Sequence, residues 1–248
     1  MAIERARALH APDPRSRTEQ HDYEGHRIDH VHRADHCYLE LTDCCHFLAE
    51  YHPGVGAGRD DGGRFRRLVA DFKCRPSVAA RHSARMRRKC QAIATLALGL
   101  RAALARSLVE AATWVPIPPS CAAGDPDYDD RLAQTLAAAF AGYDLDLRLL
   151  LTQPGSMPAD HRTPVRISEH RLYERLRVDA SALSQRPLRE RIVLFDDLLV
   201  SGKHYRCCRR RLHELLPQIP VCGWFLARRV LPQRWRGMPP PQRTDYAK

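Results

Sequence analysis

The sequence predicts an α/β fold in which a parallel sheet is flanked by helices. First, short apolar runs alternate with helical patterns from Val115 onward. Second, the run Ile192-Val193-Leu194-Phe195 lacks polar alternation, which is typical of a strand buried on both faces of a parallel sheet. Third, two irregular segments begin where a predicted strand ends, and ligand-binding loops of open α/β sheets occupy that position.

In chain order, the first strand of this sheet runs through Val115 and Ile117. It ends at Pro118-Pro119, because proline cannot donate to a sheet ladder and disfavours helix in the residue before it. The elements expected after it are a helix over 131–141, a Leu-rich buried strand over 145–151, the strand over 192–195, a basic helix over 205–216 with Leu212, Leu215 and Leu216 on its inner face, and a last strand over 221–227.

Four regions are expected along the 248 residues. Residues 1–34 are polar, His-rich and aperiodic, and so predict a disordered arm. Residues 35–109 predict a mostly helical cap that packs beside the sheet and ends in a long Ala/Leu helix from about Arg85. Residues 110–231 are expected to form the α/β domain, and residues 232–248 a basic, Pro-rich tail.

Composition favours a cytoplasmic protein that does not enter a membrane. No apolar stretch approaches the roughly 20 residues of a membrane span, and the N-terminus lacks the apolar core of a signal peptide. Nine scattered cysteines favour reduced, mostly buried thiols over a disulfide framework. Six residues resemble zinc ligands: His36, Cys37, Asp43, Cys44, Cys45 and His46. Adjacent cysteines match zinc-site spacings poorly, so we favour buried thiols in an amphipathic helix.

The net charge is +11, from 40 Lys and Arg residues against 29 Asp and Glu residues. The arginine clusters could form a nucleic-acid surface. However, no aromatic-interleaved basic motif, zinc finger or helix-turn-helix pattern accompanies them. We therefore expect nucleic-acid binding to be weak and non-specific, and a positive cleft would equally suit an anionic substrate.

The segment from Arg191 to Tyr205 carries the most chemical information. Asp196 and Asp197 are expected at the carboxyl edge of a buried strand, followed by a turn over 198–202. A helix then begins near Lys203, and the first backbone N–H groups of such a helix can bind an anion. This order would suit a phosphorylated sugar. The alternative is a buried strand that ends in two solvated acids and an ordinary glycine turn.

This segment resembles the phosphoribosyl-pyrophosphate (PRPP) motif of type I phosphoribosyltransferases: four hydrophobic residues, two acids, two hydrophobic residues, small hydroxyl residues, Gly and a polar residue. The resemblance implies that Asp196 and Asp197 accept hydrogen bonds from the ribose 2′- and 3′-hydroxyls. Ser201, Gly202 and Lys203 would then hold the 5′-phosphate. The PRPP-binding stretch is completed by Leu198, Leu199 and Val200.

An upstream segment, Trp114 to Leu132, contains Val-Pro-Ile-Pro. It resembles the pyrophosphate loop of the same enzymes, especially of the competence-protein-F-like branch, in which an arginine opens the following helix. By that resemblance Ser120, Cys121 and Arg131 would hold the pyrophosphate. The alternative is a Pro-rich connector.

The stretch from Thr152 to His170 has no hydrophobic period. A long irregular segment in a compact domain is usually a functional lid or a disordered insert. Type I enzymes carry a mobile loop at this point of the chain, which closes over PRPP, and the resemblance implies that Arg162 and Arg166 reach the pyrophosphate. A solvated loop with two surface arginines is the alternative.

The resemblance implies a Mg²⁺-dependent transferase that moves a 5-phosphoribosyl group from PRPP to a nitrogen nucleophile and releases pyrophosphate. Asp196, Asp197 and Arg131 would be its catalytic residues, and the two carboxylates would reach Mg²⁺ only through PRPP. The alternative is a catalytically inactive PRPP- or nucleotide-sensing regulator. Val200 and His204 favour it, because they replace hydroxyl residues of the family pattern. The acceptor and the oligomeric state, a homodimer included, are left open.

Overall fold

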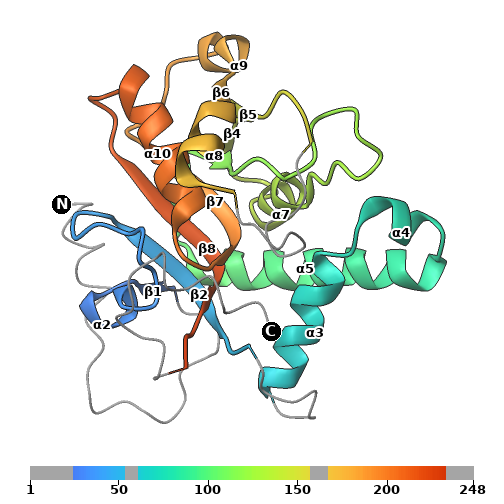
Figure 1. Ribbon diagram of the computed structural model, residues 1–248. Coiled ribbons are helices and arrows are strands. Elements are labelled where there is room, and N and C mark those ends of the chain that lie inside the picture. The colour runs from blue at the N-terminus through green and yellow to red at the C-terminus, as the bar shows by residue number, and fades with distance from the viewer. Residues whose placement is uncertain (1–24, 54–60, 157–166, 233–248) are drawn as a thin grey trace.

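The computed structural model describes residues 25–53, 61–156 and 167–232, which form an α/β fold (Figure 1). A six-stranded sheet has the order β1-β2-β8-β7-β3-β4, and every neighbouring pair is parallel except β1 with β2. Its strands are β1 (His26–Arg27), β2 (Cys45–Tyr51), β3 (Ala112–Pro116), β4 (Asp146–Leu147), β7 (Arg191–Leu199) and β8 (Val221–Arg229). A separate antiparallel pair consists of β5 (Leu151–Thr152) and β6 (Arg177–Val178). The predicted fold class, a mostly parallel sheet flanked by helices, is confirmed.

Helices cover both faces of the sheet. They are α2 (His30–Arg33), α3 (Asp61–Phe72), α4 (Pro76–Ala80), α5 (Ser83–Ala103), α6 (Arg106–Glu110), α7 (Arg131–Ala139), α8 (Glu169–Arg175), α9 (Ala180–Ser184) and α10 (Lys203–Leu215). Figure 1 shows α8 and α10 together on one side of β7 and β8, away from α3 and α5. The long helix expected from about Arg85 is α5.

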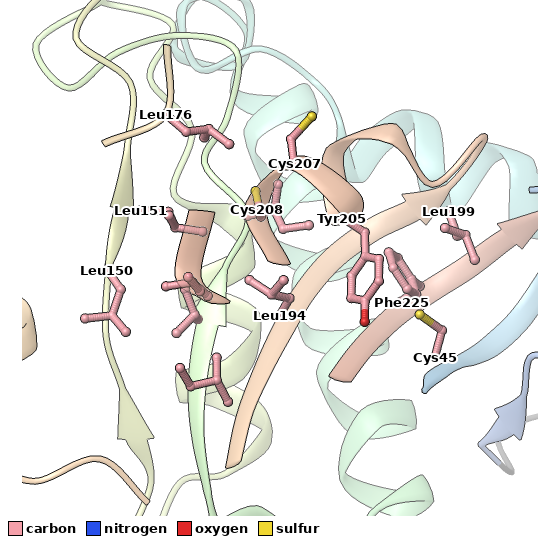
Figure 2. Close-up of a cluster of buried hydrophobic side chains, with 14 of the residues drawn as sticks. Cys45, Leu150, Leu151, Leu176, Leu194, Leu199, Tyr205, Cys207, Cys208 and Phe225 are labelled. Atoms are coloured by element: carbon pink, nitrogen blue, oxygen red, sulfur yellow. The ribbon is translucent and has the colours of Figure 1, made fainter. Parts of the chain in front are cut away.

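Strand β7 is buried on both faces, as its unbroken apolar run predicts. Ile192 and Leu194 face the core under α8 and α10, where they join Tyr205, Cys208 and Phe225 (Figure 2). Val193 and Phe195 face the opposite core, which α3, α5 and α7 cover. Successive residues of a strand point to opposite faces, so one strand supplies both cores.

The chain reverses its direction of winding between β3 and β7. From β3 the chain passes through α7 to β4 on one side, whereas from β7 it passes through α10 to β8 on the other side. The two helices also lie on opposite faces of the sheet. Adjacent strands with this arrangement form a topological switch point, where ligands of open α/β sheets bind beyond the carboxyl ends of the strands.

The N-terminal region differs from the sequence prediction in two ways. Residues 25–34, which the sequence places in a disordered arm, contain β1 and α2. The helix expected around the adjacent cysteines is instead strand β2, which pairs with β8 from Cys45 to Tyr51. Cys45 and Phe47 face one core and Leu48 the other. Pairing with a strand far away in sequence overrides local preference here.

Two further elements differ in detail. The single strand expected over 145–151 is divided into β4, which joins the main sheet, and β5, which pairs with β6. Leu215 is 56% exposed rather than on the inner face of α10. It is the last residue of that helix, and the buried stripe is formed by Tyr205, Cys208 and Leu212.

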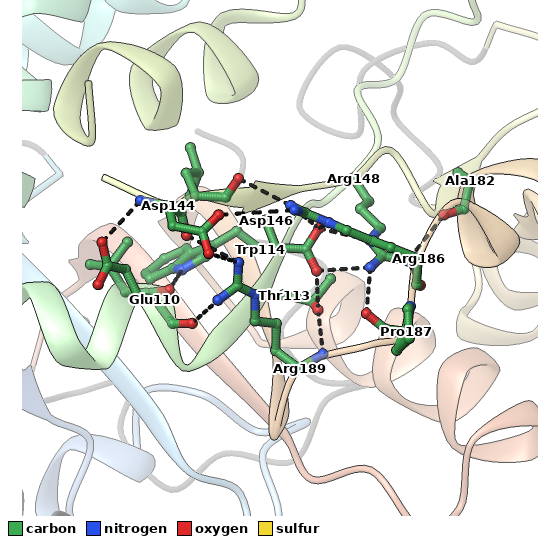
Figure 3. A network of polar contacts seen from close by, with 12 residues as sticks. Glu110, Thr113, Trp114, Asp144, Asp146, Arg148, Ala182, Arg186, Pro187 and Arg189 are labelled. Carbon is green, nitrogen blue, oxygen red and sulfur yellow. Dashed lines mark hydrogen bonds and ion pairs between the residues drawn. The ribbon is translucent and has the colours of Figure 1, made fainter. Parts of the chain in front are cut away.

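A buried polar network holds the amino ends of β3, β4 and β7 together (Figure 3). Arg148 and Asp146 form an ion pair at 2.8 Å, and both side chains are 1% exposed. Asp146 also accepts a hydrogen bond from Thr113 at 2.7 Å. Arg148 donates to four backbone carbonyls in the segment that leads into β7: Ala182, Leu183, Arg186 and Pro187. This network lies at the opposite end of the sheet from Asp196 and Asp197.

In the ranges that the structure describes, no helix has the length and apolar character needed to cross a membrane.

Candidate ligand-binding site

Asp196 and Asp197 lie inside β7 rather than after it. The sequence places the end of the strand at Phe195, but the ladder with β8 continues through Leu198 and Leu199. Because strand residues alternate between faces, the carboxyl group of Asp196 lies on the α10 face and that of Asp197 on the α7 face. The two acids are neighbours in sequence but have separate surroundings.

The carboxylate of Asp197 belongs to a charged cluster of Lys73, Lys89, Asp129, Arg131 and Asp197. Lys73 Nζ lies 2.8 Å from one oxygen of Asp197, and Arg131 Nη2 donates to the other. Arg131 Nη1 lies 2.9 Å from Asp129 Oδ2, and Lys89 Nζ lies 2.8 Å from the same oxygen. The cluster therefore joins the end of α3, the middle of α5 and the start of α7 to β7.

The electrostatic surroundings shift the two carboxyl groups in opposite directions. Burial opposes ionisation of Asp197, but the charges of Lys73 and Arg131 outweigh it and hold the pKa of Asp197 below its usual range. Burial and the adjacent charge of Asp197 raise the pKa of Asp196. Asp196 Oδ1 accepts the backbone N–H of Asp197 at 2.7 Å. Asp197 is thus a fixed anion, whereas Asp196 holds its proton more tightly than an ordinary carboxyl group.

Arg131 is the first residue of α7, as the sequence predicts, and the fold brings it to the acid pair. Its side chain is 15% exposed and its guanidinium is held by two carboxylates. Lys73, at 37% exposed, is the more accessible cation of the charged cluster. Sequence reasoning missed Lys73, Lys89 and Asp129. Asp129 could have been found from the sequence, because it lies two residues before Arg131. The two lysines could not, because they reach the site through helix packing.

The Pro-rich loop leaves β3 directly beside β7. Pro116 pairs with Phe195, and Ile117 N donates to Phe195 O at 2.8 Å, one residue before Asp196. Ser120 and Cys121 follow in this loop and are partly exposed. In the described part of the chain, no hydrogen bond joins either of them to the acid pair. The register of β3 with β7 brings the start of the loop to the acid pair.

Three hydrogen bonds with neighbouring segments fix the Pro-rich loop. Asp127 accepts the backbone N–H of Ser77 at 3.1 Å, at the start of α4. Ser156 donates to Asp125 at 2.5 Å and accepts the backbone N–H of Ala122 at 3.0 Å. The loop is therefore irregular but held in place, as its prolines predict.

The turn between β7 and α10 has the expected form. Leu199 is buried and ends β7, and Gly202 has φ = 86°, a left-handed conformation that favours glycine. Lys203 begins α10, as predicted. Its side chain is buried, and its ammonium group donates to the carbonyl of Ile167 at 2.6 Å. Lys203 therefore makes an internal contact, whereas the PRPP resemblance assigns it to the 5′-phosphate.

Arg162 and Arg166 lie outside the described residues. The residues that flank this stretch nevertheless contact the site from both sides. Ser156 bonds the Pro-rich loop, and the carbonyl of Ile167 accepts from Lys203. Of the predicted lid, 152–170, the first residue belongs to β5 and the last two begin α8, and only 157–166 lies outside the described residues. The residues on either side of that stretch contact the two loops expected to hold PRPP.

No group of three or more His, Cys, Asp or Glu side chains suited to a metal ion occurs in the described residues. Both oxygens of Asp197 already bond cations, so of the acid pair Asp196 alone has carboxylate oxygens to offer Mg²⁺. This donor set fits indirect contact through a ligand better than a protein-held ion.

The six residues that resemble zinc ligands in the sequence include Asp43. Its carboxylate accepts the backbone N–H of Glu40 at 2.6 Å and pairs with Arg209 at 3.3 Å.

Compared with known proteins, the sequence matches no protein-family model, and no curated protein matches it.

Proposed function

We propose that the protein binds PRPP at the carboxyl end of β7 and acts as a phosphoribosyltransferase of the type I class. One observation carries this proposal. The acid pair, the Pro-rich loop and the glycine turn before α10 meet at the topological switch point between β3 and β7. A sugar that carries one phosphate and one pyrophosphate needs such a site, with an acid between two loops.

In this proposal the ribose lies against Asp196. Its carboxyl group accepts hydrogen bonds from the ribose hydroxyls, and in the ionised form these bonds are charge-assisted and about twice as strong as neutral ones. Asp197 has a different role from the one that the sequence alone implies. Because both of its oxygens bond Lys73 and Arg131, it positions these two cations beside the ligand.

The two phosphate ends lie on either side of the ribose. The hydroxyl of Ser201 and the backbone N–H groups of Ser201 and Gly202 receive the 5′-phosphate, next to the amino end of α10. Lys73 and Arg131 face the pyrophosphate, with the Ser120–Cys121 part of the Pro-rich loop. Mg²⁺ bound with the ligand would add charge neutralisation of the leaving pyrophosphate.

The proposed reaction breaks the C1–O bond between the ribose and the pyrophosphate and forms a C1–N bond to the nucleophile. The bonding electrons of the C1–O bond leave with the pyrophosphate, and the nitrogen supplies the new pair. The positive charge that develops on the ribose ring is then close to the acid pair, of which Asp197 is the fixed anion. Fixed charges placed where charge develops lower a barrier without reorganisation.

Binding without turnover is the second candidate function. Arg131 and Lys203, the two cations that the family pattern assigns to the two ends of PRPP, both make internal contacts. A ligand would have to compete with these contacts or bind beside them. A PRPP- or nucleotide-sensing regulator could use the same site with the cations held back from the ligand.

Pyrophosphate release separates the two functions. The protein is incubated with PRPP, Mg²⁺ and a panel of nitrogen bases and amines, beside the variants Asp196→Asn and Asp144→Asn. Asp144 is a 66% exposed control at the other end of the sheet. Release that Asp196→Asn abolishes and Asp144→Asn retains supports the enzyme. PRPP binding without release favours the regulator, and absence of binding contradicts both.

A further inference from the structure

A short stretch of the N-terminal region lies directly on the turn between β7 and α10. His36 Nδ1 lies 2.7 Å from the carbonyl oxygen of Val200, and Tyr38 N donates to the carbonyl of Ser201 at 2.9 Å. The side chain of Leu39 closes over Gly202, where an added Cβ would come within 2.8 Å of it. Three consecutive turn residues are thus contacted by residues 36–39.

The His36 contact has a defined direction. A carbonyl oxygen only accepts, so Nδ1 of His36 carries the hydrogen and donates it to Val200. His36 is fully buried, and burial lowers its pKa to about 4. The imidazole is therefore neutral at physiological pH, and Nε2 has no hydrogen-bond partner among the described residues.

Residues 36–39 are anchored on both sides. Before them, the buried carboxylate of Asp35 lies 3.0 Å from Arg228 Nη1 of β8. After them, Arg209 of α10 lies 3.3 Å from Asp43 and 3.6 Å from Glu40. The stretch is consequently attached to α10, which follows the turn, and to β8, the strand that pairs with β7.

These contacts set the direction of the turn's amide groups. In a trans peptide the C=O of one residue and the N–H of the next point in roughly opposite directions. The carbonyls of Val200 and Ser201 both point toward residues 36–39. The N–H groups of Ser201 and Gly202, which share those peptide planes, therefore point away, and successive N–H groups on one side form an anion-binding concavity.

We propose that residues 36–39 hold the 200–203 turn in its anion-binding shape, with His36 as a positioning residue for that turn. The identity of the anion as the 5′-phosphate of PRPP rests on the proposed function, whereas the shaping of the turn does not. A glycine at φ = 86° admits many backbone conformations, and the contacts from His36, Tyr38 and Leu39 select one of them.

The test compares His36→Leu, which removes the donor, with His36→Asn, whose side-chain N–H can replace Nδ1–H. His30→Leu is the control, because His30 is exposed on α2. Ribose 5-phosphate and inorganic pyrophosphate serve as separate probes of the two ends of the site. We expect His36→Leu to weaken the binding of ribose 5-phosphate about threefold to tenfold, the equivalent of one neutral hydrogen bond. The affinity for pyrophosphate should stay unchanged. His36→Asn should restore most of the loss.

Amide chemical shifts of Ser201 and Gly202 provide a readout that needs no ligand. They should move in His36→Leu and stay in place in His30→Leu. If both amides stay unchanged in folded His36→Leu, the inference is overturned, as it is by equal losses of both probes. If the wild type binds neither probe but the amides move, the proposed function fails while the shaping of the turn stands. If His36→Leu does not fold, Leu39→Ala takes its place in the same comparison.

Discussion

Asp196 and Asp197 are adjacent in β7, yet the fold gives their carboxyl groups opposite surroundings. The sequence shows two identical acids and predicts equivalent roles for them. Strand geometry separates them, because Asp197 reaches Lys73 and Arg131 on one face while Asp196 lies on the other. Alternation along a strand could have been foreseen, but only if β7 had been expected to continue past Phe195. The lysine partner could not, because α3 reaches β7 only through tertiary packing.

The charged cluster predicts unequal losses of stability when Arg131 and Lys73 are each replaced by an uncharged residue. Arg131→Met leaves the buried carboxylates of Asp129 and Asp197 short of a partner, so we expect it to lower the free energy of unfolding by about 3 kcal/mol. Lys73→Met removes a cation that is 37% exposed, and about 1 kcal/mol or less is expected. Urea denaturation of both variants measures the difference. Equal costs would show that solvent, rather than burial, governs the cluster.

The raised pKa of Asp196 predicts a pH-dependent stability. The folded protein binds this proton more tightly than the unfolded chain, so its stabilisation is complete below the unfolded pKa of about 4 and is lost as pH rises through the folded pKa. Asp196→Asn cannot ionise. Its free energy of unfolding should therefore rise relative to wild type between about pH 4 and about pH 7. A constant difference in the free energy of unfolding between the two proteins across this range would contradict the raised pKa of Asp196.

Asp197 provides the opposite comparison. Its folded pKa is lowered, so its stabilisation is present above about 4 and is lost as pH falls through the folded pKa. The destabilisation by Asp197→Asn should accordingly shrink in acid. The same denaturation series, extended below about pH 4, measures it. Parallel pH profiles for the two Asn variants would show that the acids share one environment after all.

Among the secondary-structure elements, long and strongly patterned ones were predicted well. The apolar run of β7, the glycine turn and the basic α10 were foreseen from local sequence, as was α5. Strand β2 was not, because its place between β1 and β8 depends on pairing with a strand 178 residues away in the sequence. The division of the 145–151 strand also escaped prediction, because the pairing of β5 with β6 is a tertiary contact that the local sequence does not show.

The polar network around Arg148 should stabilise the packing of β3, β4 and β7 without affecting ligand binding. Arg148→Met leaves buried Asp146 and four carbonyls without this donor, so we expect a loss of about 3–5 kcal/mol in unfolding free energy. Arg186→Met removes a 46% exposed partner of the same carboxylate, and about 1 kcal/mol or less is expected. Urea denaturation tests both. A change in PRPP affinity in folded Arg186→Met would contradict the separation of this network from the site.

Over the whole molecule, the net charge of +11 does not translate into a free basic surface on α10. Each of its four arginines pairs with a carboxylate: Arg206 with Glu169, Arg209 with Asp43, and Arg210 and Arg211 with Glu214. Arg210 and Arg211 also stack on Tyr173. This arginine cluster, one of those that could form a nucleic-acid surface, is thus used within the fold.

Nucleic-acid binding should therefore be weak, non-specific and strongly reduced by salt. Filter binding with a generic duplex and a single strand, at low and near-physiological salt, measures it. We expect dissociation constants weaker than about 1 μM at physiological salt, because the arginines are dispersed over several helices and those of α10 already pair with carboxylates. Tighter binding that PRPP modulates would favour the regulator over the enzyme.

The most direct test of the proposed site is the calorimetric titration of the protein with PRPP and Mg²⁺. Wild type and Asp144→Asn should bind with similar affinity. Asp196→Asn should bind at least about tenfold more weakly, because it loses charge-assisted hydrogen bonds of about 1.5–3 kcal/mol to the ribose. Asp196→Asn that is folded and binds PRPP as tightly as the wild type, or a wild type that produces no heat of binding, would contradict a PRPP site at the carboxyl end of β7.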